Sequence, residues 1–392
     1  MPEPETFEID REPVHVSYSE KTVLREVYGF SGGIGRVMLD GYRWRPRGRP
    51  SKTLLMYMHP AATMHNLPVP AAMVRAGAHV LLAGSRYNRN DAPLIMENAV
   101  RDFGAYVRHA KEVWGYEKVV MVGWSGGGSL TTFYQSMAVN PTVTETPAGD
   151  PVDLSGFVPG DGFVCQAAHL SRATVLKTMI DPSVLDENDP SIRDPELDIY
   201  DPRNPNQPPY SADYIAHFRA AQIRRIRRRT AYVKELLHSL RKKGASEAER
   251  AIVTHRTLAD PRFIDPTIEP NDRVPGQSYL GPPELSNSSP AGLARFSTLR
   301  AWLSQWSFDD TNADAIAHAP NIRVPLLVLE NSGDDAVPQP HPREFFDAAT
   351  GATDKTFHVI RGANHYYQDQ PEHCAEAVRT VIDWMRARQL FD

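Results

Sequence analysis

The sequence is poor in cysteine, and its two thiols do not suggest a disulfide framework. Cys165 and Cys374 are the only cysteines among 392 residues, whereas small disulfide-built domains need several pairs. The chain opens with MPEPETFEID, which has neither the basic start nor the apolar run of a secretory signal. We therefore expect a cytoplasmic protein with both thiols reduced.

Long apolar runs and an excess of positive charge are also missing. No stretch approaches the roughly 20 apolar residues that cross a bilayer, so we expect no contact with a membrane. Lys and Arg number 43 against 48 Asp and Glu, a formal net charge of -5. This balance argues against nucleic acid as a general partner. We expect a small-molecule substrate, and a homodimer is compatible with the sequence.

The length exceeds that of a typical single domain, which predicts either one large domain with an insertion or two domains. Strand-like apolar runs alternate with amphipathic helical segments at both ends of the chain, and this alternation predicts a mostly parallel central sheet with helices on both faces. The rhythm stops in the middle, where much of the proline lies. We predict an α/β core of residues 1–170 and 313–392, and a largely helical cap of residues 171–312 inserted after the sixth strand. The first six strands are expected at Val23–Tyr28, Arg36–Trp44, Thr53–Met58, His79–Ala83, Val119–Val122 and Gly162–Ala168.

A serine between glycines follows the fifth of these runs. Gly123-Trp124-Ser125-Gly126-Gly127 fits G-x-S-x-G, the sharp strand-to-helix turn that lifts a serine hydroxyl above a sheet. Glycines suit the turn because the serine backbone is strained and side chains on either side would collide. The N–H of Gly126 is then placed to bind an oxyanion. Apolar residues recur next at the spacing of one helix face: Leu130, Phe133, Tyr134 and Met137.

A second donor to an oxyanion is expected from the loop after the third strand. That strand ends in His59-Pro60-Ala61-Ala62, upstream of the serine. A hydrolase with a G-x-S-x-G turn takes the second donor of its oxyanion hole from a loop in this position. The backbone N–H of Ala61 is the predicted donor. His59 itself either borders the substrate or caps local structure.

Two further segments carry candidate partners for the serine. The apolar run Val324–Glu330 leads into NSGDDAVP, and Thr356–Ile360 leads into RGANH. Both loops follow strands, so their polar side chains are expected at the same edge of the sheet as the serine.

The order Ser125, Asp334, His365 resembles the α/β-hydrolase superfamily, in which nucleophile, acid and histidine follow one another in this sequence order. The resemblance covers the chain on both sides of its irregular middle. It implies a serine hydrolase with these three residues as its triad, and Asp335 competes with Asp334 for the acid position. Pro60 departs from the pattern, because glycine usually follows the histidine in that loop.

Several other residues are candidates for the substrate pocket. Trp124 lies inside the serine motif and His169 ends the sixth strand, although a structural role also fits the histidine. A helix is expected near Ala291–Trp306, and its Trp302 and Trp306 either cover an apolar pocket or pack the insertion. The first interpretation predicts an apolar or aromatic substrate.

These features predict hydrolysis of a carboxylic ester or lactone through an acyl-enzyme at Ser125, with no metal and no organic cofactor. The same triad also suits carbon–carbon bond hydrolysis or acyl transfer. A non-catalytic binding protein on this fold is the alternative from another class. The basic run Arg224–Arg229, on an expected helix over Ala212–Lys243, predicts a solvated face, an anionic partner or a subunit contact.

Overall fold

The computed structural model describes residues 6–20, 35–244, 249–290 and 292–392. Within them, eight strands form one sheet in the order β1-β2-β4-β3-β5-β6-β9-β10. β2 pairs antiparallel with β1 and β4, and the remaining neighbours are parallel. The prediction of a mostly parallel sheet is confirmed. The strands are β1 Ile9–Ser19, β2 Arg36–Pro46, β3 Thr53–His59, β4 His79–Gly84, β5 Lys118–Ser125, β6 Gly162–Ala168, β9 Leu326–Asn331 and β10 Lys355–Ile360.

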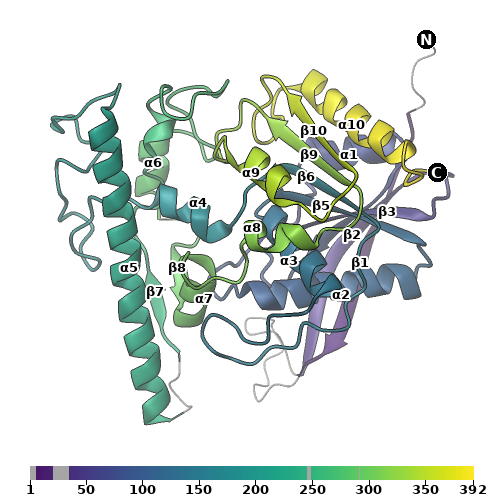
Figure 1. Cartoon of the computed structure of the whole chain (residues 1–392), viewed down its shortest axis with the longest axis horizontal. Coiled ribbons are helices and arrows are strands. Elements are labelled where there is room, and N and C mark those ends of the chain that lie inside the picture. The colour runs from purple at the N-terminus through teal and green to yellow at the C-terminus, as the bar shows by residue number, and fades with distance from the viewer. Residues whose placement is uncertain (1–5, 21–34, 245–248, 291) are drawn as a thin grey trace.

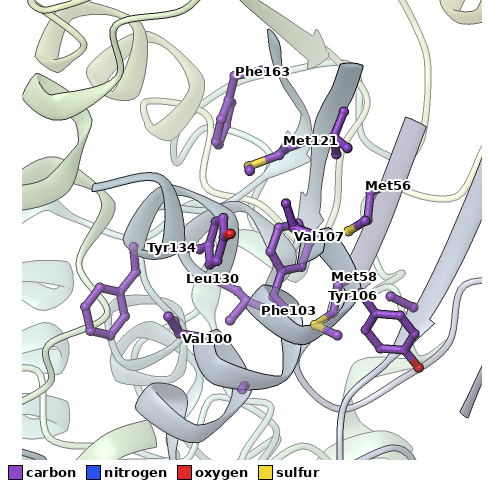
Figure 2. Packing of buried hydrophobic residues seen from close by; sticks show 14 of the residues in the cluster. Met56, Met58, Val100, Phe103, Tyr106, Val107, Met121, Leu130, Tyr134 and Phe163 are labelled. Carbon is purple, nitrogen blue, oxygen red and sulfur yellow. The ribbon is translucent and has the colours of Figure 1, made fainter. Parts of the chain in front are cut away.

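Helices cover both faces of this sheet (Figure 1). On one face, α1 (Pro68–Arg75) and α10 (Pro371–Arg386) pack on the sheet. On the other lie α2 (Met96–Glu112) and α3 (Gly127–Val139). Figure 2 shows this second layer. The α2 side chains Phe103, Tyr106 and Val107 meet the strand side chains Met56, Met58 and Met121 there.

The first strand was not expected. We predicted the first strand at Val23–Tyr28, a segment that lies outside the described residues. The structure has an earlier strand, because β1 occupies Ile9–Ser19 and pairs along its whole length with β2. Val14 and Val16 are buried, whereas His15 between them is exposed and most of the other residues of the strand are charged or polar. An edge strand with one wet face has this alternation, which is easily mistaken for a polar segment.

The described part of the segment between β6 and β9 adds no strand to the sheet and forms its own packed body (Figure 1). The predicted helix near Ala291–Trp306 is only partly right: a strand at Phe296–Thr298 comes first, and the helix starts at Leu299. Phe296 is exposed. The segment contains α4 Arg172–Met179, α5 Ala212–Lys243, β7 Ala251–Val253, η2 Pro261–Phe263, α6 Pro283–Ser288, β8 Phe296–Thr298 and α7 Leu299–Gln305. It returns to the core through α8 Ala315–His318 and η3 Ala319–Asn321, and α9 His341–Ala348 lies later in the chain, between β9 and β10.

The basic run of α5 is only partly a solvated face. Arg224 is exposed, but Arg225 is buried and donates to both carboxylate oxygens of Glu187, at 2.9 and 2.7 Å. Arg229 is also buried and pairs with Glu187 at 2.6 Å, and Arg227 pairs with Asp309. Much of the run therefore holds the insertion together. Within the described residues no helix is long and apolar enough to cross a membrane.

Candidate active site

Ser125 lies at the turn between β5 and α3, with a left-handed backbone at φ 51°. An L-residue other than glycine seldom adopts this conformation, which costs on the order of 1–3 kcal/mol. The pairing of β5 with β6 shifts register between Trp124 and Ser125, so the serine departs from the plane of the sheet. It is half-buried at the carboxyl end of the central strand. This is the geometry expected of a nucleophile elbow.

The glycines around Ser125 are required by close packing. A Cβ on Gly123 would lie 2.7 Å from Thr131 Oγ1, and one on Gly128 would lie 2.7 Å from Ala168 Cβ. At Gly127 a Cβ would overlap the carbonyl oxygen of Met58. The start of α3 therefore approaches β3 and β6 more closely than any side chain allows.

His365 and Asp334 form a buried pair at the same edge of the sheet. Nδ1 of His365 lies 2.9 and 3.1 Å from the two carboxylate oxygens of Asp334. Asp334 Oδ1 also accepts hydrogen bonds from the backbone N–H groups of Ala336 and Val337, at 2.7 and 2.8 Å. The carboxylate is thus held in one orientation and fixes the imidazole ring with its Nε2 free for other contacts.

Asp335 is arranged differently from its neighbour. Its Oδ1 is buried and has no hydrogen-bond partner among the described residues. Burial and the charge of Asp334 raise the pKa of Asp335 to about 6. The hydrogen bonds to His365 therefore favour Asp334 over Asp335 as the residue that orients the imidazole.

The charges around His365 favour its protonated form. Burial alone would lower its pKa, but the carboxylate of Asp334, its hydrogen bond and the charge of Asp335 raise the pKa of His365 overall. Among the described residues no hydrogen bond joins Ser125 to His365. Hydrogen bonds of this kind are often long in unliganded enzymes and shorten with substrate bound.

His59 and His169 converge on Gly126. A Cβ on Gly126 would lie 2.9 Å from His59 Nε2 and 3.5 Å from His169 Nε2. The backbone N–H of His169 donates to the carbonyl of Ser125 at 3.3 Å. The N–H of Ala61, predicted to bind an oxyanion, donates to His59 Nδ1 at 3.2 Å.

Trp124 supports the imidazole from the interior. Its indole is buried and meets His365 edge-on, with ring centroids 6.3 Å apart. Tyr367 packs on the same indole at 5.8 Å, donates to Asn331 Oδ1 at 2.6 Å and accepts from Gln166 at 3.0 Å. The sequence did not single out Tyr367, because only folding brings the ends of β6 and β9 beside it.

Trp302 and Trp306 lie in the interior of the insertion. Both are fully buried and stack on each other with centroids 5.2 Å apart. Trp302 Nε1 donates to Thr230 Oγ1 and Trp306 Nε1 to the carbonyl of Ala294. These contacts are those of residues that pack the insertion, the second of the two interpretations.

Arg172, which the sequence did not single out, lies close to the histidines. It begins α4 and is buried. Its guanidinium donates to Gln305 Oε1 at 2.7 Å and pairs with Asp91, from the loop after β4. Burial lowers the pKa values of His59 and His169, and the charge of Arg172 adds to this effect. A single arginine in a chain of 43 basic residues carries no sequence signal of this role.

A cavity of about 440 Å³ opens between the insertion and the loops after β9 and β10. His365 and Asp335 belong to its wall. Polar side chains make up much of the rest, and no lysine or arginine lines it. Within the described residues, no group of three or more His, Cys, Asp and Glu is arranged to hold a metal ion.

The comparisons with known proteins add the fold. No protein-family model and no curated protein sequence matches the chain. A structure of DcsB with its substrate analogue is 12% identical, covers 96% of this chain and 99% of its own, and has a TM-score of 0.50. The α/β hydrolase GrgF from Penicillium sp. sh18 is 10% identical, with 96% and 98% covered and a TM-score of 0.50. The chain therefore has the α/β-hydrolase fold that the sequence predicted.

Proposed function

We propose that the protein is a serine hydrolase that cleaves a carboxylic ester or lactone through an acyl-enzyme at Ser125. The observation that carries the proposal is the strained serine at φ 51° on the β5–α3 turn. A fold keeps a costly backbone conformation where the surrounding structure enforces it, and such sites cluster at catalytic centres. The buried pair of His365 and Asp334 supplies the base that such a serine needs.

In the first step His365 takes the Ser125 proton as Oγ attacks the carbonyl carbon. Asp334 stabilises the imidazolium that results, and the carbonyl oxygen becomes an oxyanion. The N–H of Gly126, the residue after the nucleophile, donates to that oxyanion, as in other nucleophile elbows. Each donor of this kind is typically worth about 3 kcal/mol in the transition state.

In the second step the oxyanion collapses, the carbon–oxygen bond to the leaving group breaks, and His365 returns its proton to the leaving oxygen. Water then attacks the acyl-enzyme while His365 again takes a proton. The acid is released and Ser125 regains its hydroxyl hydrogen, so the enzyme ends in its starting state.

The cavity beside His365 favours a polar group on the leaving side of the substrate. The prediction of an apolar or aromatic substrate depended on the indoles, and these are packed inside the insertion. The cavity wall instead offers carboxylates, hydroxyls and side-chain amides, which bind hydroxyl or amine groups: Asp272, Gln277, Ser278, Tyr279, Asp335, Asn364, Tyr366, Gln368 and Gln370.

Carbon–carbon bond hydrolysis and a purely binding role remain the competing functions. A diketone assayed beside esters of the same acid separates the first, because only a carbon–carbon hydrolase releases a ketone. A binding protein would be unaffected by loss of the serine hydroxyl.

Fluorophosphonate labelling tests the proposal directly. We expect one adduct, on the peptide that contains Ser125, and hydrolysis of short p-nitrophenyl esters by the same preparation. Ser125→Ala should abolish the adduct and lower kcat by at least about 10³-fold, since the nucleophile is lost. Ser129→Ala, in the helix α3 that follows the turn, is the control and should retain both. Folded wild-type protein that neither labels nor hydrolyses an ester would refute the proposal.

Paired variants test the acid. Asp334→Asn should lower kcat by about 10³–10⁴-fold, because the imidazole loses the partner that orients it. Asp335→Asn should retain most activity and be more stable at pH 7.5 by on the order of 1–2 kcal/mol. The sign follows from the raised pKa of Asp335, about 6: the folded state prefers the protonated form, so its ionisation above that pH opposes folding. Steady-state kinetics and denaturant unfolding measure both, and a large loss confined to Asp335→Asn would reverse the assignment.

The pH dependence should follow His365. Only the neutral imidazole accepts the serine proton, and the pKa of His365 is raised above its ordinary value of 6.5. The acid limb of kcat/KM should therefore have its midpoint above pH 6.5. In Asp335→Asn the midpoint should move to lower pH, because one of the charges that raise this pKa is gone. A wild-type midpoint below 6.5 would contradict the electrostatic description.

A further inference from the structure

The loop after β3 does not offer the backbone donor that an oxyanion hole usually takes from it. The N–H of Ala61 already donates to His59 Nδ1 at 3.2 Å. Pro60, the residue before it, has no N–H. If Gly126 supplied the single hydrogen bond, half of the usual stabilisation of a tetrahedral oxyanion would be missing.

The hydrogen bond from the Ala61 N–H to Nδ1 also fixes the tautomer of the His59 ring. Since Nδ1 accepts a hydrogen bond, a neutral ring must carry its proton on Nε2. The ring is neutral at ordinary pH, because burial and the nearby Arg172 and His365 lower the pKa of His59 to about 3. His59 therefore presents an Nε2–H donor and no positive charge.

The position of that donor is set by Gly126. His59 Nε2 lies only 2.9 Å from the point where a Cβ of Gly126 would be. The ring is half-buried, and Nε2 makes no hydrogen bond within the described residues. The Nε2–H donor thus lies against Gly126, the residue whose own N–H is proposed to bind the oxyanion.

We infer that the Nε2–H of His59 is the second donor of the oxyanion hole, in place of the Ala61 N–H. The inference rests on the proposed function, because an oxyanion forms only if Ser125 attacks a carbonyl. The Ala61 N–H then acts indirectly: its hydrogen bond to Nδ1 keeps the His59 ring in the tautomer that carries a proton on Nε2. His59 is a catalytic residue in this account, and Ala61 a positioning residue.

His169 is the alternative donor, and its geometry is poorer. Its Nε2 lies 3.5 Å from the same point, against 2.9 Å for His59. Its Nδ1 has no hydrogen-bond partner among the described residues, so nothing fixes its tautomer. The backbone N–H of His169 donates a hydrogen bond to the carbonyl of Ser125. This contact fits a residue that supports the turn at Ser125.

Two substitutions of His59 distinguish a side chain that donates to the oxyanion from one that only holds the loop after β3 in place. In His59→Asn the side-chain oxygen can replace Nδ1 and accept from Ala61, but no N–H reaches the Nε2 position. In His59→Gln the longer side chain can bring an N–H to the Nε2 position but no longer accepts from Ala61. His59→Asn thus keeps the acceptor for the Ala61 N–H, and His59→Gln keeps the donor at the Nε2 position.

We expect His59→Asn to lower kcat by about 10²–10³-fold with little change in KM, as when one oxyanion donor is removed. His59→Gln should retain clearly more kcat than His59→Asn. Affinity for a trifluoromethyl ketone, which forms an oxyanion on the serine, should fall in the same order. His65→Asn is the matched control, because His65 lies in the same loop and bonds Thr63; its kcat should be unchanged.

The opposite order, with His59→Asn active and His59→Gln impaired, would overturn the inference and make His59 a brace for the loop. Equal activity of both variants and wild type would overturn it as well. The variants are compared only after wild-type protein has been shown to form the Ser125 adduct and to hydrolyse an ester. A wild type that does neither refutes the proposed function first, so the two failures are distinguishable.

Discussion

The left-handed backbone of Ser125 is the constraint on which the arrangement of the site depends. A serine at φ 51° persists because β5 ends there and α3 begins two residues later, pressed against β3 and β6. Glycine at positions 123, 127 and 128 allows that approach, since any side chain would collide with the neighbouring backbone or strand. The packing of the core thus maintains the strain at the serine.

The histidines at this edge of the sheet show how neighbours divide one residue type into different roles. His365 faces a fixed carboxylate, so its pKa is raised and it can hold a proton during the reaction. His59 is half-buried, and this burial together with the nearby Arg172 and His365 lowers its pKa to about 3, so it stays neutral. The proposed base and the proposed neutral hydrogen-bond donor can therefore both be histidines.

Much of the fold and several residues of the candidate site could be predicted from the sequence, because the patterns that indicate them are local. The glycine-flanked Ser125, the loops that carry Asp334 and His365, and the strand and helix alternation each occupy a few consecutive residues. The first strand was missed because its edge position gives it a polar face. The predicted pocket at Trp302 depended on where α7 faces, and α7 packs against α5 and α4 inside the insertion.

Other parts of the site depend on contacts between distant segments. Arg172 meets Asp91 and Gln305 only after folding, and the engagement of Ala61 by His59 depends on a ring orientation that no pattern encodes. Periodicity and motifs place residues at the edge of the sheet, but they do not state which hydrogen-bond donors are already used. For this reason the three residues proposed as a triad could be named from the sequence, and the donors proposed for the oxyanion hole could not.

Partitioning of a common intermediate tests the central claim, an acyl-enzyme at Ser125, most directly. Esters of one acid with different leaving groups would be hydrolysed in water with added methanol, and the ratio of acid to methyl ester measured. If all of them pass through one acyl-enzyme, the ratio is the same for every leaving group while the rates differ. A ratio that changes with the leaving group would mean direct attack by water, and would contradict the account.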